Sequence, residues 1–496
     1  MSNVLVIRDK KLINDQDIGM DLRHWKPSRE PGIPIYQQLY ERFRDAIAAG
    51  QLRPGDRVPS VRSLASELNV AKGTVEQAYQ ILLGEGYFLA RGPAGTVVSP
   101  QLDRLEAKRY TSVPASPQRS SPYVPAEHAP PLPFQMGLPA LDAFPRKTWT
   151  RLANQNQRAL GALAMRYPDP AGYAPLRRAI AAYLGVSRGI ACLPEQVFVT
   201  AGYWGALELV CRSVLNPGEA GWYENPGYIF ARQFLKQAGM QAYAVPLDEE
   251  GLDLIAGQQH CPQARFAIVT PTHQSPMGMA MSLPRRLQLL DWARQQQAWI
   301  VEDDYDSEFR YHGRPLPALK SLDRDDRVIY TGTFSKVLNP GLRLAYLVAP
   351  LSQVGRFQQA AHYSGGPGSI LTQATVADFM EQGYFARHLR KMRTLYAQRR
   401  AWLVEALEQT LGERLQIQSQ AGGIHVLANL KQAEDDRVLA KAAQAKGLAV
   451  QALSDWQMPP AAHKGLLMGF ANISDQRMAD DWVRRLSAAI AVFSNH

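Results

Sequence analysis

Cysteine is scarce in this sequence. Only three cysteines occur in 496 residues, at Cys192, Cys211 and Cys261, and none of them belongs to a CxxC pair. Three widely spaced cysteines predict reduced thiols rather than a disulfide framework or a zinc site. The sequence also lacks an apolar run long enough for a transmembrane helix. Residues 1–19 hold only a short apolar run broken by charge, so we expect no signal peptide, no membrane partner and a cytoplasmic location.

Acidic residues are fewer than basic ones. The chain has 45 Asp and Glu against 55 Lys and Arg, a formal net charge of +10. This excess permits binding to nucleic acid without establishing it. Between residues 34 and 98 there are seven basic and six acidic residues, so a DNA-binding site there must be recognised from its pattern. With 46% apolar and 20% charged residues, the chain has the composition of a globular protein with two or three domains.

Large apolar residues are rare in one internal stretch, residues 100–133. Proline, serine and alanine dominate its second half, "SVPASPQRSSPYVPAEHAPPLP". Such a segment cannot bury enough surface to fold, and its prolines keep it extended. We therefore predict an N-terminal arm at 1–33, a small domain at 34–99, a linker at 100–133 and a large domain at 134–496.

The small domain has the periodicity of three amphipathic helices. Apolar residues recur at helical spacing in 34–50, 60–70 and 71–87, and Ser60 is a good N-cap for the second helix. The segment "YFLARGPAGTVVS" then predicts two short strands around a Gly/Pro turn. Helix, helix, tight turn, helix and hairpin is the layout of a winged helix-turn-helix. On spacing alone, a small helical bundle that binds protein or acts as a spacer remains the alternative.

The residues themselves favour the first interpretation. "RVPSVRSLASELNVAKGTVEQAYQILLGEGYFLARGPAGTVV" resembles the DNA-binding domain of the GntR family of bacterial regulators. The resemblance implies that the third helix enters the major groove of double-stranded operator DNA. Seven side chains would then contact DNA: Arg57, Ser60 and Arg62 at backbone phosphates, Lys72, Thr74 and Gln77 at the major groove, and Arg91 at the wing. Ala71 and Lys72 replace the usual Ser-Arg pair, which weakens the N-cap and exchanges a bidentate donor for a point charge.

The large domain alternates apolar strands with amphipathic helices. Five strands are predicted, at 196–200, 220–224, 265–270, 298–303 and 327–332. Short apolar strands with helical crossovers predict a mostly parallel sheet covered on both faces. Such sheets bind ligands at the carboxyl ends of their strands. Polar or glycine-rich loops follow these five strands, namely "TAGYW", "ENPGY", "TPTHQSPMG", "EDDYD" and "TGTFSK", so we expect a pocket there.

Lys336 ends the last of these loops, where it is either an ordinary surface lysine or the attachment point of a cofactor. A pyridoxal phosphate site needs a lysine for the Schiff base and an acid that keeps the ring nitrogen protonated. Asp303 stands at the end of another predicted strand. Thr333, Ser335 and Arg343 surround the lysine and can donate to a dianionic phosphate. No glycine-rich nucleotide-binding loop competes for that role.

Residues 134–480 resemble the fold-type I aminotransferases of class I/II, and a GntR-like domain joined to that fold is the hallmark of the MocR/GabR regulator family. The resemblance implies an α/β domain with a smaller C-terminal α+β subdomain, pyridoxal 5'-phosphate as cofactor, a homodimer and a small-molecule effector. By motif, Lys336 would form the Schiff base. Further roles follow in the same way: Asp303 at the ring nitrogen, Tyr305 at the ring hydroxyl, Tyr228 stacked on the ring, Gly202, Tyr203, Trp204, Thr333, Ser335 and Arg343 at the phosphate, and Tyr167 at the phosphate of the partner subunit.

Three departures from the family pattern affect the expected function. Ser275 and Met277 alter the loop near the ring, and "YWGALEL" alters the phosphate loop. Leu467 in "KGLLMGF" stands where aminotransferases carry the arginine that binds the substrate's α-carboxylate. We therefore expect little catalytic turnover and an effector that is an amine, an amino acid held elsewhere (Arg232 is one candidate) or pyridoxal phosphate itself. A working aminotransferase with a DNA tether and a cofactor-free scaffold remain the alternatives.

Overall fold

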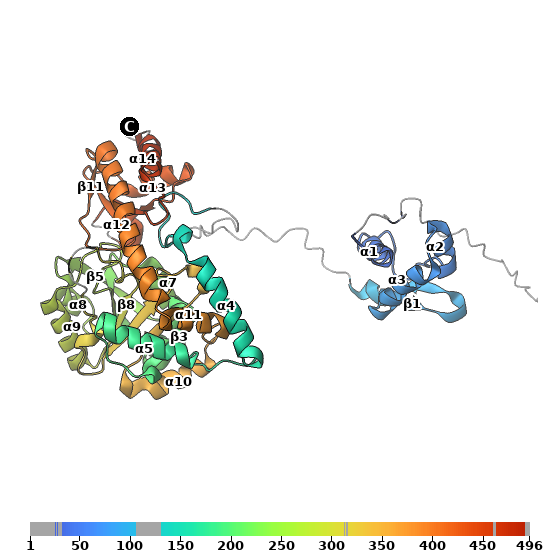
Figure 1. Cartoon of the computed structure of the whole chain (residues 1–496), viewed down its shortest axis with the longest axis horizontal. Helices are drawn as coiled ribbons and strands as arrows, with labels where there is room; N and C mark the ends of the chain where they lie inside the picture. The colour runs from blue at the N-terminus through green and yellow to red at the C-terminus, as the bar shows by residue number, and fades with distance from the viewer. Residues whose placement is uncertain are drawn as a thin grey trace, which may run out of the picture. The chain divides into compact units, whose positions relative to one another are not determined.

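The computed structural model describes Trp25, Pro27, residues 32–105, 130–311, 313, 316–459 and 463–491. They form two units, one within residues 1–124 and the other within 125–496 (Figure 1). Most of the arm and of the linker predicted at 100–133 lies outside the described residues. Among the described residues, no helix has both the length and the apolar character needed to cross a bilayer.

The first unit is a winged helix-turn-helix, which confirms the fold predicted from the sequence. Its elements are α1 (Ile35–Ala48), α2 (Val61–Leu68), α3 (Lys72–Gly84) and the antiparallel hairpin of β1 (Phe88–Ala90) and β2 (Thr96–Val98). Ser60 caps α2, because its hydroxyl oxygen accepts a hydrogen bond from the Ser63 amide at 3.0 Å. Ala71 precedes α3 and provides no such cap.

An aromatic cluster forms the core of this unit. Phe43 is fully buried, and its ring centroid lies 5.5 Å from that of Tyr79 and 5.2 Å from that of Phe88, in edge-to-face contacts. Trp25 packs on Phe43 at 4.7 Å, although it belongs to the segment predicted as an arm. At least this part of the arm therefore contributes to the core.

The second unit is built on an eight-stranded sheet with the order β3-β10-β9-β8-β7-β4-β5-β6. The strands are β3 (Val197–Thr200), β4 (Ala220–Asn225), β5 (Gln241–Asp248), β6 (Gly251–Leu252), β7 (Phe266–Val269), β8 (Trp299–Asp304), β9 (Val328–Thr333) and β10 (Ala345–Val348). Strands β9, β8, β7, β4 and β5 run parallel, which confirms a mostly parallel sheet. Strand β10 is antiparallel to both of its neighbours.

Helices cover both faces of this sheet (Figure 1). One face packs against α6 (Tyr203–Val214), α7 (Ile229–Gln237) and α10 (Val354–Tyr363). The opposite face packs against α8 (Leu254–His260) and α9 (Leu283–Gln296) at one end and α5 (Ala174–Arg188) and α11 (Ile370–Glu381) at the other. Helix α4 (Arg146–Leu160) lies against α11.

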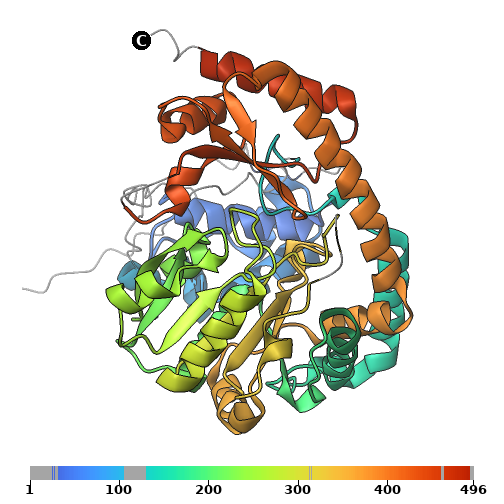
Figure 2. The same ribbon diagram turned by 90° about the vertical axis from the view of Figure 1, so that its left-hand side faces the viewer.

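A smaller subdomain follows the long helix α12 (Tyr384–Leu411), as Figure 2 shows. It contains an antiparallel sheet of order β11-β12-β14-β13, made of β11 (Leu415–Ile417), β12 (His425–Leu430), β13 (Gln451–Ala452) and β14 (Gly465–Gly469). Helices α13 (Asp436–Ala445) and α14 (Gln476–Ala491) complete it. This is the α+β subdomain that the family resemblance implies.

Candidate functional site

A cavity of about 330 Å³ lies at the carboxyl edge of the large sheet. All five loops predicted from the sequence contribute to it, because β3, β4, β7, β8 and β9 end at this edge. Its lining comprises Met136, Gly137, Leu138, Tyr203, Trp204, Tyr228, Phe230, Ser275, Asp303, Tyr305, Thr333, Ser335, Lys336, Pro340, Arg343, Ile424, His425, Gln451 and Trp456. The cavity thus joins most of the predicted cofactor residues with side chains of the smaller subdomain.

Lys336 follows the end of β9 by three residues and extends into this cavity. Its Nζ donates a hydrogen bond of 2.8 Å to the carbonyl oxygen of Gly137. Burial lowers the pKa of Lys336, against the opposing influence of Asp306 and Asp303. A lowered pKa increases the share of neutral amine, which is the nucleophilic form. Lys336 is therefore not an ordinary surface lysine.

Asp303 lies on β8 with a side chain that is 8% exposed. Burial raises its pKa to about 7; the Tyr203 hydroxyl opposes this, and the nearby carboxylates of Asp304 and Glu224 add to it. Within the described residues, no cationic side chain forms an ion pair with Asp303. A cationic ring nitrogen at this place would stabilise the carboxylate, so the environment of Asp303 fits a protonated pyridine ring.

Arg343 lines the cavity, and Gly202 lies beside its guanidinium just outside the lining, at an end that suits a phosphate. Gly202 precedes α6 with a φ of 82°, and a Cβ built on it would lie 3.3 Å from the guanidinium of Arg343. The first amides of α6 and this guanidinium can both donate to an anion. The Ser335 amide donates to the Thr333 hydroxyl oxygen at 3.1 Å. Trp204 lies in the first turn of α6 and lines the same cavity, its side chain is 46% exposed, and the role of its backbone amide at a phosphate stays a prediction.

Tyr228 and Tyr305, the two residues predicted to contact the ring, both line the cavity. Tyr228 has its ring centroid 6.2 Å from that of Tyr203 and 5.9 Å from that of Trp456. The Tyr305 hydroxyl lies 2.9 Å from Nδ1 of His273, and that nitrogen lies 3.0 Å from Oδ1 of Asp306. The buried histidine and aspartate thus orient the tyrosine hydroxyl.

Tyr167 and Arg232 lie outside the cavity lining. Tyr167 is fully exposed, with a relative accessibility of 103%, and makes no contact with the cavity of its own chain. This placement is compatible with a role in a partner subunit, which stays a prediction. Arg232 donates instead to the backbone oxygen of Gln457 at 3.3 Å.

The residues predicted to contact DNA lie on the surface of the winged-helix unit. Of the seven, six are exposed and Thr74 is half-buried. Lys72 lies 3.8 Å from Glu76 on the same helix, a weak exposed pair that DNA phosphates can replace. The guanidinium of Arg57 lies beside Gly95 in the wing turn. Their contacts with DNA stay a prediction.

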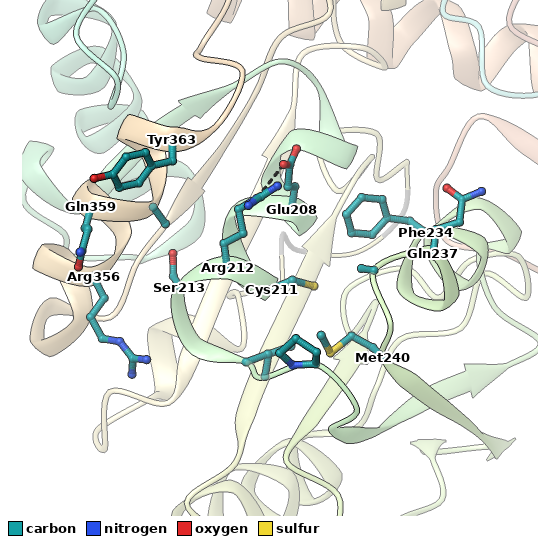
Figure 3. A pocket seen from close by; sticks show the side chains of 14 residues that line it. Glu208, Cys211, Arg212, Ser213, Phe234, Gln237, Met240, Arg356, Gln359 and Tyr363 are labelled. Atoms are coloured by element: carbon teal, nitrogen blue, oxygen red, sulfur yellow. Dashed lines mark hydrogen bonds and ion pairs between the residues drawn. The ribbon is translucent and has the colours of Figure 1, made fainter.

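A larger groove on the second unit offers no comparable chemistry. It occupies about 760 Å³ between α6, α7 and α10 (Figure 3). Glu208 and Arg212 in its wall neutralise each other across 2.8 Å. Burial raises the pKa of the Cys211 thiol to about 12, so this cysteine stays protonated and unreactive.

Comparison with known proteins supports the fold described for each of the two units. The family "Bacterial regulatory proteins, gntR family" matches residues 35–98, and "Aminotransferase class I and II" matches residues 139–476. The chain is 37% identical over 475 residues to the probable rhizopine catabolism regulatory protein MocR of Rhizobium meliloti, covering 94% of this chain and 96% of that protein. This chain is a MocR-type regulator of the GntR family. It is a DNA-binding transcriptional regulator with an aminotransferase-like domain.

Other relatives agree with this MocR-type assignment. The pyridoxine biosynthesis regulator PdxR of Corynebacterium glutamicum is 34% identical, with 92% of this chain and 95% of that protein covered. Among solved structures, the α-aminoadipate aminotransferase LysN of Thermus thermophilus is 30% identical with a TM-score of 0.66, covering 73% of this chain and 92% of that one. A multiple substrate aminotransferase from Thermococcus profundus is 28% identical with the same TM-score, covering 74% and 92%. The fold-type I architecture and pyridoxal 5'-phosphate as the cofactor of this MocR-type chain are confirmed.

The sequence did not reveal several lining residues of the MocR-type site. His425 and Trp456 come from the smaller subdomain, and Gly137 comes from the segment after the linker. His425 Nε2 lies 3.0 Å from the Pro276 oxygen, and burial lowers the pKa of His425 to about 4. These residues lie outside the loops that follow the strands of the large sheet. The sequence feature that could have pointed to one of them is His425, a single histidine within the apolar segment "GGIHVLANL".

The raised pKa of Asp303 predicts how pH affects the cofactor-free protein. A carboxyl group whose pKa is higher in the folded chain stabilises the fold below its unfolded pKa, and this stability is lost as pH rises through about 7. The rise of the Asp303 pKa from 3.8 to about 7 corresponds to a change of at most about 4 kcal/mol in the free energy of unfolding. Asp303→Asn should therefore lose less stability than wild type between pH 5 and pH 8 in thermal melts. If stability fell equally with pH in wild type and Asp303→Asn, the raised pKa of Asp303 would be contradicted. An equal effect of the exposed control Asp325→Asn would contradict it too.

Proposed function

We propose that the cavity binds pyridoxal 5'-phosphate covalently through Lys336 and that its occupancy changes the affinity of the winged-helix unit for operator DNA. One observation supports this most strongly. Lys336 follows β9, Asp303 lies on β8 and Arg343 precedes β10, and all three line one cavity in which they could take the aldehyde, the ring nitrogen and the phosphate. We place the regulator in the cytoplasm, where its operator DNA lies.

Bound pyridoxal phosphate supplies an aldehyde that forms reversible covalent bonds with amines. The remaining work falls to residues of this chain. Asp303 would hold a proton on the ring nitrogen, and Tyr228 would pack against the ring. The Tyr305 hydroxyl, oriented by His273, would donate to the ring hydroxyl. Arg343 and the first amides of α6 would anchor the phosphate, and Lys336 would supply the amine for the aldehyde.

The effector end of the cavity has little to attract a carboxylate. Leu467 on β14 is fully buried in an apolar cluster with Met277, Leu427, Leu453 and Trp456. Leu467 lies behind the lining residue Trp456, Arg232 lies outside the lining, and Arg343, which we assign to the phosphate, is the one arginine among the described lining residues. The total volume of about 330 Å³ is near the lower limit for ligand cavities, so cofactor and effector together must be small. We propose an amine without an α-carboxylate, or pyridoxal phosphate itself, as effector.

A titration tests both the site and the regulation. Small primary amines should change the visible absorbance of the cofactor-loaded protein and also its affinity for a DNA fragment from upstream of its own gene, measured by fluorescence anisotropy. Standard α-amino acids should do neither at low millimolar concentration, because the α-carboxylate has no cationic partner. Exchange with many amino acids at low concentration would contradict the effector class. An absorbance change without any change in DNA affinity would contradict the regulatory function.

We also propose a homodimer that completes the site. Tyr167 and Met165 lie in one loop and are 103% and 88% exposed, unusually high values for large apolar side chains. A partner subunit that covers this loop would bring Tyr167 to the phosphate end of the other cavity. The same symmetry would present two winged-helix units to two DNA half-sites.

Aminotransferase activity is the second candidate function. The similarity to the solved aminotransferases at 28–30% identity favours it. Buried Leu467 disfavours it, because loss of the bidentate charge pair weakens α-amino acid binding. Steady turnover of an amino donor with a keto acid would favour this second function over the first.

A further inference from the structure

The excess positive charge of this regulator lies mainly outside its DNA-binding unit. Residues 34–98 have one more basic than acidic residue, whereas residues 134–496 have 38 Lys and Arg against 31 Asp and Glu. The aminotransferase-like part therefore contributes +7 of the formal +10. Fold and cofactor binding do not require this charge, and four of its cations lie together on helix α4.

Helix α4 concentrates cations on one face. Its sequence, "RKTWTRLANQNQRAL", contains no acidic residue. A continuous exposed surface is lined by Arg146, Lys147, Thr150, Arg151, Asn154, Gln155 and Arg158. The four cations are accompanied only by neutral side chains that can donate hydrogen bonds. We call these seven residues the α4 face.

On two other surface helices of this unit, an arginine pairs with a carboxylate of its own helix. Arg212 pairs with Glu208 on α6 at 2.8 Å, as Figure 3 shows, and Arg294 pairs with Asp291 on α9 at 2.5 Å. On the α4 face, none of the four cations forms an ion pair with a carboxylate of the described residues. The carboxylate that contacts α4, Asp378, accepts a hydrogen bond from Asn156 at 2.7 Å on the buried side of the helix.

Two of these cations also lie where they destabilise helix α4. Arg146 and Lys147 occupy the first turn of α4, which has no acidic residue and no side-chain cap at Pro145. Positive charge at a helix N-terminus is unfavourable by about 0.3–1 kcal/mol per residue, because it repels the free N–H groups there. Helix stability therefore does not explain these cations, whereas an anionic partner does.

The cationic surface continues onto the start of α12. Arg151 donates to the Tyr384 hydroxyl at 2.9 Å, and the Arg387 guanidinium lies 4.5 Å from the centroid of the same ring. Arg390 and Lys391 follow on α12 and are exposed. Tyr384 thus connects the two groups of cations, and Figure 2 shows α4 beside α12.

We propose that the α4 face binds backbone phosphates of the operator DNA outside the half-sites read by the winged helices. Duplex DNA is the polyanion that this chain already binds, and Thr, Asn and Gln are typical phosphate donors. Helix α4 has 15 residues and is about 22 Å long, a length over which a duplex carries about 13 phosphate charges.

A second copy of the chain fits the α4 face less well. A two-fold interface that placed α4 against its own copy would bring four cations against four, which is repulsive.

Binding of DNA to the α4 face would also link the two functions of the regulator directly. The unit that holds the effector would then touch DNA itself, and the effector could change DNA affinity through this contact.

The salt dependence of binding to a mixed-sequence 60-bp duplex tests the proposal in the full-length, cofactor-loaded protein. The variant carries Arg146→Gln, Lys147→Gln and Arg158→Gln. The control removes the same charge from exposed positions of the smaller subdomain, with Lys441→Gln, Lys446→Gln and Arg477→Gln. Loss of three phosphate contacts should reduce the slope of log K against log salt by about 2.7, and should weaken binding about tenfold or more at moderate salt. The control should change the slope by less than about 0.5.

Two further variants distinguish the loss of a DNA contact from a loss of protein stability. Arg146→Lys with Arg158→Lys keeps the charge and should keep the slope. Asn154→Glu adds one negative charge to the α4 face and should weaken DNA binding while the cofactor absorbance and the melting temperature stay unchanged. An unchanged slope in the triple variant would overturn the proposal, as would equal losses in variant and control. A shift to monomer without a change in slope would overturn it too and would assign the α4 face to the subunit interface.

Discussion

Phe43→Ala is expected to unfold the winged-helix unit and abolish DNA binding while the aminotransferase-like unit keeps its cofactor. Phe43 is fully buried and makes edge-to-face contacts with Trp25, Tyr79 and Phe88. Truncation of a buried phenylalanine costs about 3–5 kcal/mol. A domain of this size has little stability to spare, since small domains bury a smaller share of their surface.

Calorimetry, DNA anisotropy and cofactor absorbance together measure this effect. We expect loss of one unfolding transition and of DNA binding, with the second transition and the absorbance retained. Leu89→Ala is a matched control in the same unit, because Leu89 is 45% exposed and its truncation should cost little. Loss of absorbance together with DNA binding would show that the two units unfold as one, against the division described above.

Lys336→Ala is expected to remove covalent cofactor attachment completely. The alanine has no amine for the aldehyde, whereas the phosphate contacts around Arg343 are left intact. The visible absorbance of the bound cofactor should therefore disappear after dialysis. Lys441→Ala, at an exposed position on α13, should behave as wild type.

The same variant tests the regulatory claim. In wild type, addition of pyridoxal phosphate or an amine should change DNA affinity, and Lys336→Ala should show the same DNA affinity with and without either compound. A variant that still responds to amines would place the sensor elsewhere, although it would leave the winged-helix function untouched.

Much of the large sheet could be predicted because its strands are short, apolar and followed by polar loops. Strand β8 was predicted at 298–303 and lies at Trp299–Asp304, and β9 was predicted at 327–332 and lies at Val328–Thr333. Parallel strands bring their carboxyl ends to one edge, so the loops after them could be assigned to one cavity. Lys336 and Asp303 were predicted in this way, and both line that cavity.

Other features needed long-range information. Strand β10 was missed because the short apolar run "AYLV" carries no signal for antiparallel pairing on both sides. His425 and Trp456 reach the cavity from a subdomain more than 80 residues beyond Lys336 in the sequence. Trp25 was assigned to an N-terminal arm at 1–33, yet its ring packs against Phe43 of the small core.

Reduction of the coloured protein with borohydride, followed by peptide mass spectrometry, tests the central claim most directly. Borohydride converts a reversible bond between amine and aldehyde into a permanent one, so the mass of the phosphopyridoxyl group marks the lysine that carried it. We expect the label on the peptide that contains Lys336 and on no other. A label on a different lysine, or coloured protein without any label, would contradict the account.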